Sequence, residues 1–491
     1  MYRLVLYYLL TLLAGGVLLS FLGLIKYSPL SILYSVSVLV VFSALTNMLF
    51  AKVFKVTPGN ASFYITALIL ASIMSPVAPG DIQGTVLLAV IGIWAMGSKY
   101  LFAVGRKHVF NPAGFAAAAS GLLLVHSASW WIAGNSYLMP VIIFGGFLIA
   151  RKIQRLDLVL SFFVASLATV AFLSTGSPLQ SIWMTLLHAP LFFLAFTMLT
   201  DPATMPPTRD MRIAYGILVG IWFTPGIHIS GFYFSPELAL ILGNLFVYAV
   251  SPKGRWSLTL KKKEEIAENT YEFTFIPEKK YEFTAGQYLE WTLPEGKKVD
   301  AKGNRRYFTI ASSPTEPEVR LGVRMMDAPS TFKQTLMKLE IGDTISAGQL
   351  AGDFTLPSNK NTKLVFIAGG IGVTPFRSMV QNIMDTGKRD VVMFYSNKKA
   401  EEVAYYDVLE RARQQIGMKT VYALTNDTRT FSGSYNGFVD ATLIKKEVPD
   451  YRERTFYISG PRGMVLAFEK TLKELGIPQS RVRTDYFPGF A

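Results

Sequence analysis

Charged residues are distributed very unevenly along this 491-residue chain, and that distribution limits the possible folds more than any motif does. Residues 1–252 contain 17 Lys, Arg, Asp and Glu residues, whereas residues 253–491 contain 65, although each part has a formal charge of +7. A lipid bilayer excludes charge and selects long apolar segments. We therefore expect a membrane-embedded part, a hinge at "VSPKGRW" (250–256), and then a water-exposed part.

The first part contains ten apolar segments, and a membrane span needs about 20 mainly apolar residues. No small-residue cleavage site follows the first segment, so we interpret it as a span rather than a signal peptide. The ten segments are 4–25, 29–50, 63–78, 85–104, 110–126, 137–150, 157–174, 181–200, 211–227 and 236–251.

The basic residues between these segments predict a topology. With the N-terminus inside, the inner loops carry nearly all the Lys and Arg residues, and the outer loops carry Lys26, Asp81 and Glu237. This bias favours ten spans in a cell (inner) membrane, with both termini and the water-exposed part in the cytoplasm. The lipid bilayer is then the first partner of the chain.

The composition excludes several classes of chemistry. The chain has no cysteine, which excludes disulfides, thiolate-bound zinc and cysteine-ligated iron–sulfur clusters. No basic run is interleaved with aromatic residues, so we expect no nucleic-acid partner. We predict no metal site. Electron transfer in such a chain would require an organic cofactor, haem or a partner protein.

Two polar segments interrupt the apolar part at predicted inner boundaries, "RKHVFNPAGFAAAASG" (106–121) and "FTMLTDPATMPPTRD" (196–210). Asn111 and Asp201 each precede a proline, an arrangement typical of helix ends. Breaks at corresponding positions of two halves also indicate a binding site. We therefore take Asn111, Asp201 and Thr204 as candidate ligand-binding residues.

The segments "HVFNPAGF", "FFLAFTMLTDPATMPPTRDMRIAYGILVGI" and "ELALILGNLFVY" resemble the flavin-carrying membrane subunits of Rnf complexes and of sodium-pumping NADH:quinone reductase. The resemblance implies a ten-span fold that carries FMN on the threonine of an S-G-A-T motif. This chain reads "SASWWIAGNSY" where the motif is expected. We therefore expect non-covalent FMN or riboflavin, or a quinone, in this part.

Residues 253–357 predict a small antiparallel β-barrel. Short segments rich in Tyr, Phe, Thr and Val alternate with turn residues. The segment "RRYFTIASSP" places Arg306 and Phe308 on one face of a strand and Tyr307 and Thr309 on the other. Arginine suits a diphosphate, an aromatic ring suits an isoalloxazine, and a hydroxyl suits flavin N5.

This segment resembles the R-x-Y-[ST] signature of ferredoxin–NADP reductases, with Phe308 in place of Tyr. The resemblance implies an FAD site and a catalytic role for Phe308 and Thr309. The later segment "DAPSTFKQTL" is similar to the second signature of that family. It implies that Ser330 and Thr331 meet the pyrophosphate.

Residues 358–491 predict a parallel α/β nucleotide-binding domain. "KLVFIAGGIGVTPFRSMV" (363–380) predicts a buried strand, a glycine turn and a helix. Gly369, Gly370 and Gly372 permit close approach to phosphates, and Thr374 and Pro375 begin the helix.

The segment "TFYISGPRGMV" (455–465) resembles the family's C-G-P-x-x-M turn, with Ser459 in place of Cys. Ser459 would then lie near the nicotinamide as a catalytic residue, and Gly460 and Pro461 would bind the cofactor. After the second strand, Ser396 and Lys398 would hold a 2′-phosphate and slightly favour NADPH over NADH. Phe487 would cover the flavin.

These features together predict a membrane-bound flavin-dependent NAD(P)H oxidoreductase. Electrons would pass from NAD(P)H through FAD to FMN, riboflavin, a quinone or a partner protein. A haem-dependent transmembrane reductase is an alternative that needs paired axial histidines, and the chain has only four histidines. A transporter with a nucleotide-sensing domain is a further alternative, and ion pumping is a separate hypothesis.

Overall fold

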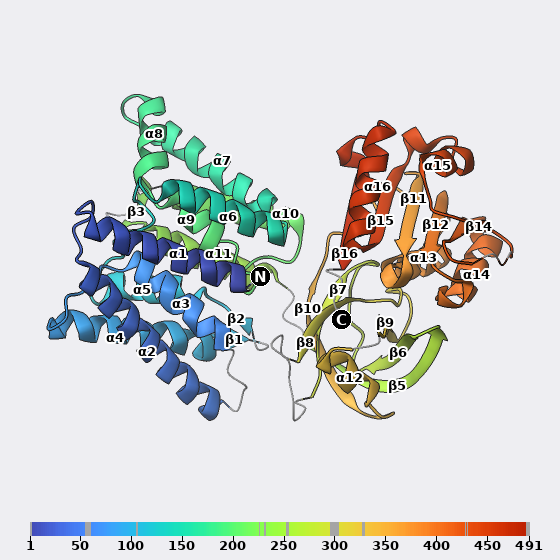
Figure 1. The fold of residues 1–491 in the computed structure, drawn as a ribbon, viewed down its shortest axis with the longest axis horizontal. Helices are drawn as coiled ribbons and strands as arrows, with labels where there is room; N and C mark the ends of the chain where they lie inside the picture. The colour runs from blue at the N-terminus through green and yellow to red at the C-terminus, as the bar shows by residue number, and fades with distance from the viewer. Residues whose placement is uncertain are drawn as a thin grey trace. The chain divides into compact units, whose positions relative to one another are not determined.

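The computed structural model describes residues 2–54, 60–104, 107–224, 226–229, 232–251, 255–294, 304–326, 329–427, 429 and 431–487. The chain divides into two compact units, Met1–Lys253 and Gly254–Ala491, which are described separately below (Figure 1). Part of the expected hinge, 252–254, lies outside the described residues.

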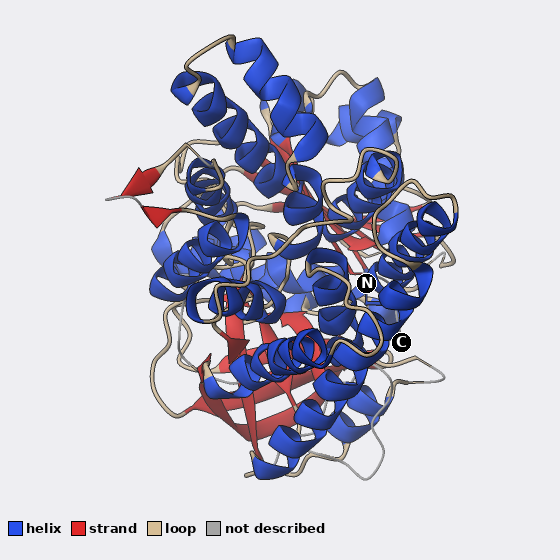
Figure 2. Cartoon of the chain, turned by 90° about the vertical axis from the view of Figure 1, so that its left-hand side faces the viewer, coloured by secondary structure: helices blue, strands red, loops and turns tan. Residues whose placement is uncertain are grey.

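The first unit is almost entirely helical (Figure 2). Each of the ten apolar segments contains a helix, and the eighth is split by a bend of 65° between α8 and the helix that follows. The helices are α1 (Tyr2–Phe21), α2 (Pro29–Val53), α3 (Asn60–Ile73), α4 (Ile82–Leu101), α5 (Pro112–Leu123), α6 (Met139–Ile153), α7 (Leu156–Leu173), α8 (Pro178–His188), α9 (Leu191–Phe193), the π-helix η1 (Leu194–Met198), α10 (Arg209–Trp222) and α11 (Pro236–Val250).

Within the described residues, four helices are long and apolar enough to cross a membrane: α1, α2, α4 and α7. A fifth span results if the bent pair α8 and α9–η1 counts as one. The remaining apolar helices, such as α5 and α11, have fewer residues than a straight span requires. Two short hairpins, β1–β2 (Ala103–Val104 and Lys107–His108) and β3–β4 (His228–Ile229 and Phe232–Tyr233), complete the unit.

Small residues and one ion pair hold neighbouring helices of this unit together. A Cβ built on Gly220 of α10 would lie 2.7 Å from the Phe162 carbonyl oxygen of α7, so only glycine permits this approach. The Arg212 guanidinium donates to Asp157 at 3.0 and 3.1 Å and joins the same two helices. Glu237, expected in an outer loop, is instead buried in the first turn of α11, where it accepts a hydrogen bond from Trp130.

The second unit begins with a six-stranded antiparallel sheet in the order β8-β7-β10-β5-β6-β9. The antiparallel pairing agrees with the sequence pattern, but the described residues of the two end strands, β8 and β9, form no ladder that would close a barrel. The sequence pattern also did not predict β10. The elements are β5 (Trp256–Ala267), β6 (Thr270–Pro277), β7 (Tyr288–Thr292), β8 (Arg305–Thr309), β9 (Val319–Arg324), α12 (Thr331–Met337) and β10 (Thr344–Ala351).

The second sheet is parallel throughout, in the order β14-β13-β12-β11-β15-β16. Every residue of its central strand β11 is buried, which explains the continuous apolar run. Its elements are β11 (Leu364–Gly369), η2 (Gly370–Val373), α13 (Thr374–Thr386), β12 (Val391–Asn397), η3 (Ala400–Glu402), α14 (Tyr406–Ile416), β13 (Lys419–Leu424), β14 (Ser434–Asn436), α15 (Ala441–Glu447), η4 (Tyr451–Glu453), β15 (Thr455–Pro461), α16 (Arg462–Glu474), η5 (Gln479–Arg481) and β16 (Val482–Phe487).

One buried hydrophobic cluster joins the two lobes, and each sheet also packs against a cluster of its own. Ala285, Ala311 and Phe354 from the antiparallel lobe pack in the same buried cluster as Phe376 of α13 and Tyr457 of β15. The Tyr457 hydroxyl also donates to the Thr355 carbonyl at 2.8 Å. The two lobes therefore form one body, and α13 is the helix between their sheets.

Arg454 connects the amino-terminal ends of neighbouring strands in the parallel sheet. Its guanidinium forks onto Asp390 at 2.7 and 3.0 Å, and it also donates to Asp450 at 2.7 Å and to the Leu364 carbonyl at 3.2 Å. These contacts join the starts of β11, β12 and β15. The Arg454 guanidinium lowers the pKa of Asp450 to about 2.

We predict that Arg454→Ala lowers the free energy of unfolding by about 3 kcal/mol, since it leaves the facing carboxylates without their cation. Arg413→Ala, which removes an exposed ion pair with Glu410, should cost less than about 1 kcal/mol. Thermal unfolding of the detergent-purified chain, followed by release of flavin fluorescence, measures both. Equal melting temperatures for the two variants would contradict the stabilising role assigned to Arg454.

Candidate functional site

The turn after β11 is shaped for close approach of a nucleotide. Gly370 has a φ of +53°, a left-handed conformation that favours glycine. A Cβ built on Gly372 would lie 2.5 Å from the Ser459 carbonyl oxygen and 2.6 Å from the Gly460 Cα atom. Thr374 and Pro375 begin α13 as the sequence predicts. The backbone of the two strand ends can therefore meet only because these positions lack side chains.

Ser459 lies at the carboxyl end of β15, beside this turn. The residue is fully buried, and its hydroxyl has no hydrogen-bond partner among the described residues. A buried hydroxyl without a partner is costly unless a ligand or water satisfies it. The Ser459 hydroxyl is therefore available to a ligand at the turn.

The last strand, β16, brings the C-terminal residues to the same edge of the sheet. Its register pairs Ser459 with Asp485, Gly460 with Tyr486 and Pro461 with Phe487. The backbone of Phe487 is thus beside the expected nicotinamide turn, while its side chain lies outside the described residues. Burial raises the pKa of Asp485 to about 6. Sequence reasoning did not single out this carboxylate.

The β8 residues occupy the outer strand of the antiparallel sheet. Arg306 lies over the Phe332 ring at 5.4 Å and Phe308 packs against the same ring with centroids 5.6 Å apart, as strand alternation requires. Thr309 is buried, whereas Tyr307 is 53% exposed. The exposed ring of β8 is therefore Tyr307, which meets Tyr288 edge-on at 5.8 Å.

Ser330 and Thr331 begin the seven-residue helix α12, where the Ser330 hydroxyl accepts a hydrogen bond from the Lys333 N–H at 3.5 Å. Phe332, the contact of Arg306, belongs to the same helix. The two segments with reductase signatures are therefore neighbours in space, although about 20 residues separate them in the sequence.

The carboxyl end of β12 carries the residues expected to read the nucleotide ribose. Ser396 is half-buried and Lys398 is exposed. The Lys398 N–H donates to Glu402 at 3.1 Å, and Arg324 pairs with the same carboxylate at 2.6 Å. A Cβ on Gly370 would lie 3.5 Å from the Arg324 guanidinium. Arg324 and Glu402 therefore lie beside the glycine turn. The sequence did not indicate either residue.

These features fit a dinucleotide and a flavin. The glycines let the ends of β11 and β15 meet at one turn, and the Ser459 hydroxyl there is a buried donor without a partner among the described residues. Arg306 and the exposed Tyr307 ring provide a cation and an aromatic surface on β8. Residues from β8, β11, β15 and β16 would together hold FAD and NAD(P)H.

A second polar site lies within the membrane unit. The Asn111 amide donates to Asp201 at 3.3 Å, and the Asn111 N–H donates to Asn244 at 2.8 Å. Asn244 in turn donates to the Tyr215 hydroxyl at 3.2 Å. His108 lies 3.7 Å from Asp201. The two polar interruptions of the sequence, 90 residues apart, therefore meet in one buried cluster.

A cavity of about 110 Å³ adjoins this cluster and is lined by Lys99, His108, Asn111, Thr197 and Asp201 among others. The hydroxyl of Thr197 and that of the adjacent, buried Thr204 have no hydrogen-bond partner in the described chain. The π-helix η1 (Leu194–Met198) contributes Thr197, and π-helical turns are frequent at functional sites. Lys99, which donates to Ser62, also lines the cavity, although no sequence motif indicated it.

Comparison with protein families finds one match in each of the two units. Residues 129–252 match the family described as NQR2, RnfD, RnfE, and residues 366–470 match the oxidoreductase NAD-binding domain. Among curated proteins, a flavohemoprotein of Pseudomonas putida is 26% identical over 252 residues, which cover 50% of this chain and 63% of that protein.

The reductase component of a stachydrine N-demethylase from Rhizobium meliloti is 28% identical and covers 42% of this chain and 59% of that protein. The chain spans between half and two thirds of the length of the curated relatives it matches. The FAD/NAD-binding domain of a Vibrio cholerae nitric oxide dioxygenase has 19% identity and a TM-score of 0.43, with 47% of this chain and 98% of that chain covered.

The matched families and the site define the class of the second unit, a flavin-dependent NAD(P)H oxidoreductase module that binds FAD and NAD(P)H. The first unit matches the NQR2, RnfD, RnfE family over residues 129–252, and its apolar helices agree with a membrane domain. The chain is a fusion of these two.

We predict that Gly372→Ala weakens NAD(P)H binding by at least about tenfold while FAD is retained, because the new methyl group displaces the Ser459–Gly460 backbone from the turn. Gly463→Ala is a matched control, since no atom lies within 4 Å of its added Cβ. Titration of both variants with NADP⁺ or NAD⁺ measures the difference. Wild-type affinity of Gly372→Ala for these nucleotides would contradict the role assigned to the glycine turn.

Asp485 predicts a pH dependence of stability. Its raised pKa means that the folded state favours the neutral carboxyl group, so this contribution is complete below the usual carboxyl pKa and is lost as pH rises through about 6. Asp485→Asn should approach the wild type as pH falls toward about 4 and melt about 2–4 °C higher at pH 8. The exposed Asp407→Asn should show no such divergence. A difference in melting temperature between wild type and Asp485→Asn that stays the same at every pH in this range would contradict the prediction.

Proposed function

We propose that the chain is a membrane-bound NAD(P)H:acceptor oxidoreductase, in which electrons from NAD(P)H reach an acceptor bound in the membrane unit. The observation that carries this proposal is the meeting of Asn111 and Asp201 at a cavity in the same chain as a reductase module. FAD, when bound, accepts two electrons and can release them singly, which suits an acceptor in a membrane.

The residues of the reductase module have separate tasks. The turn Gly369–Gly372 holds the nucleotide diphosphate against the start of α13. Ser459 and Asp485 face the nicotinamide from two neighbouring strands, and the hydroxyl of Ser459 orients it. Arg306, with Ser330 and Thr331, binds the flavin diphosphate, and Tyr307, Phe308 and Thr309 contact the flavin ring.

Ser396 and Lys398 favour NADPH over NADH in this proposal. Glu402 is already engaged by Arg324 and by the Lys398 N–H, so its charge is compensated beside a 2′-phosphate. Gly460 and Pro461 form the turn that carries the nicotinamide, and Phe487 covers the flavin from the neighbouring strand.

The cavity in the membrane unit favours a quinone head group as the acceptor. Its volume of about 110 Å³ is close to that of a cavity known to admit one benzene ring, ~150 Å³, and is too small for the three rings of FMN or riboflavin. Quinone carbonyl oxygens accept hydrogen bonds, and Lys99, Thr197 and Asn111 line the cavity with donors; Thr204, close to Asp201, is a further candidate. Asp201 and His108 are placed to exchange the protons that quinone reduction consumes.

The membrane arrangement proposed here has ten spans in the cell (inner) membrane, with both termini and the reductase module in the cytoplasm. It rests on the helix found in each of the ten apolar segments and on the distribution of Lys and Arg between them. We propose domains at 1–252 (membrane), 253–357 (FAD) and 358–491 (NAD(P)H).

We predict that Asp201→Asn lowers reduction of a short-chain ubiquinone analogue by at least about tenfold, because a proton-exchanging group is removed. Anaerobic bleaching of FAD by NADPH should keep its wild-type rate, since the reductase module is intact. Asp81→Asn, at the exposed start of α4, is the matched control for a membrane-unit carboxylate. Unchanged quinone reduction in Asp201→Asn would contradict this acceptor site.

Extraction of all flavins from the purified protein distinguishes the acceptors. FAD as the single flavin agrees with a quinone, whereas FAD together with FMN or riboflavin would identify a flavin relay. A reducible Soret band would instead favour the haem-dependent alternative. FAD that NADPH does not bleach would favour a transporter with a nucleotide sensor.

A further inference from the structure

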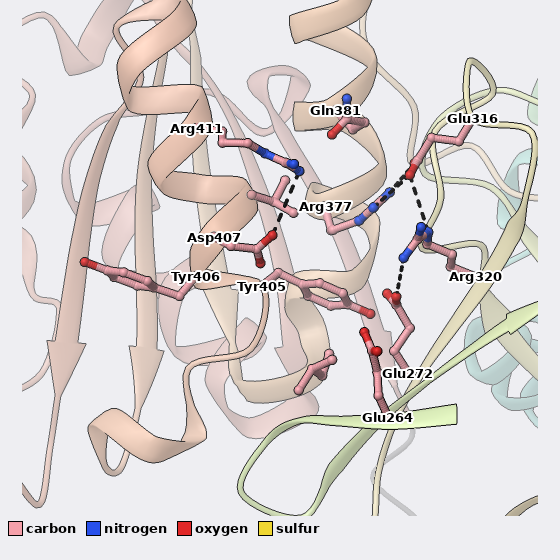
Figure 3. Close-up of a pocket in the computed structure, with 12 residues that line it drawn as sticks. Glu264, Glu272, Glu316, Arg320, Arg377, Gln381, Tyr405, Tyr406, Asp407 and Arg411 are labelled. Atoms are coloured by element: carbon pink, nitrogen blue, oxygen red, sulfur yellow. Dashed lines mark hydrogen bonds and ion pairs between the residues drawn. The ribbon is translucent and has the colours of Figure 1, made fainter. Parts of the chain in front are cut away.

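A large cavity lies between the antiparallel sheet and the first turns of α13 and α14, and its volume is about 720 Å³ (Figure 3). Its lining contains four acidic side chains and three arginines. Six of these seven charges pair with one another, and the seventh, Glu264, pairs with Lys262. The charges are therefore paired within the protein, and Arg377 and Glu316 connect the two lobes.

Arg377 of α13 is the centre of these contacts. Its side chain is only 5% exposed and forks onto Glu316, with one distance of 2.8 Å. The same guanidinium donates to the Ala311 carbonyl at 3.3 Å and lies 5.9 Å from the centre of the Tyr405 ring. Figure 3 shows Glu316 between Arg377 and Arg320, so one carboxylate receives both cations.

Two further hydrogen bonds reach the same segment of chain. The Ser378 hydroxyl donates to the Ser312 carbonyl at 2.6 Å, and the Ser313 N–H donates to Glu316 at 2.6 Å. Residues 311–313 follow closely on β8, which carries the flavin-contacting residues up to Thr309. The second turn of α13 is thus clamped to the end of the flavin strand.

The first turn of α13 belongs to the nucleotide turn, since Thr374 and Pro375 follow closely on Gly372. One short helix therefore contacts the nucleotide segment with its first turn and the flavin segment with its second. A helix is stiff over this length, so the separation of the two segments depends on how firmly its second turn is held.

We propose that Arg377 is a positioning residue for hydride transfer, which acts through Glu316 and Ala311. This inference rests on the proposed function: with both cofactors bound, a hydride, two electrons with one proton, would pass from the dihydronicotinamide to the flavin ring, so the nicotinamide would be oxidised and the flavin reduced. The rate of such a step falls steeply with misplacement, by up to ~10²-fold for an error of 1 Å. The clamp fixes this separation, whereas nucleotide affinity resides in the glycine turn.

The test is Arg377→Lys, which keeps the charge but replaces the planar fork with a single ammonium group. We expect the rate of anaerobic flavin reduction at saturating NADPH to fall about tenfold or more, with the Kd for NADP⁺ within about twofold of wild type and FAD content unchanged. A readout that does not depend on activity is amide hydrogen exchange, which should become faster at residues 311–313 in the variant.

Arg411→Lys is the matched control, because Arg411 lines the same cavity but its partner is Asp407 of the same helix, at 4.0 Å. Its flavin reduction and exchange rates should equal those of the wild type. If Arg377→Lys fails to retain FAD, Ser378→Ala provides the test instead. We expect its rate of flavin reduction to fall about threefold at an unchanged melting temperature. A wild-type reduction rate in the folded Arg377→Lys or Ser378→Ala variant would overturn the proposal, as would equal slowing in Arg411→Lys.

Discussion

The hydrogen bond from Asn111 to Asp201 joins two segments that lie 90 residues apart and that each end or begin a helix. In a bilayer, a polar side chain without a partner costs several kcal/mol, so such groups must satisfy one another. The cluster continues through Asn244 to Tyr215 and therefore orders three helices at once. The fold of the membrane unit and the ligand site proposed for it depend on the same contacts.

In the reductase module, distant segments are joined by close approach of their backbones rather than by side-chain hydrogen bonds. The ends of β11 and β15 approach so closely that a methyl group on Gly372 would overlap the backbone of Ser459 and Gly460. That approach leaves the Ser459 hydroxyl buried and without a partner among the described residues. The residues proposed for binding and reaction are therefore concentrated at one edge of the parallel sheet, where the Ser459 hydroxyl is free to meet a ligand.

Local motifs predict candidate residues for the reductase module because they depend on short stretches of chain. A buried strand, a glycine turn and a helix start lie within the 18 residues 363–380, and alternation along one strand predicts which side chains share a face. Asp485, Arg324 and Glu402 were missed because each reaches the site through strand pairing or a contact from a distant segment. The parallel register of β16 with β15 was the only signal for Asp485.

The sequence by itself determined that the chain has a membrane part and a reductase part, because exclusion of charge from lipid and the spacing of glycines are local properties. Tertiary structure alone decided that Asn111 meets Asp201, that the antiparallel strands are ordered β8-β7-β10-β5-β6-β9, and that Arg377 donates to the Ala311 carbonyl shortly after β8. The physical reason is that burial and pairing depend on which distant segments become neighbours, and hydrophobic periodicity does not encode that choice.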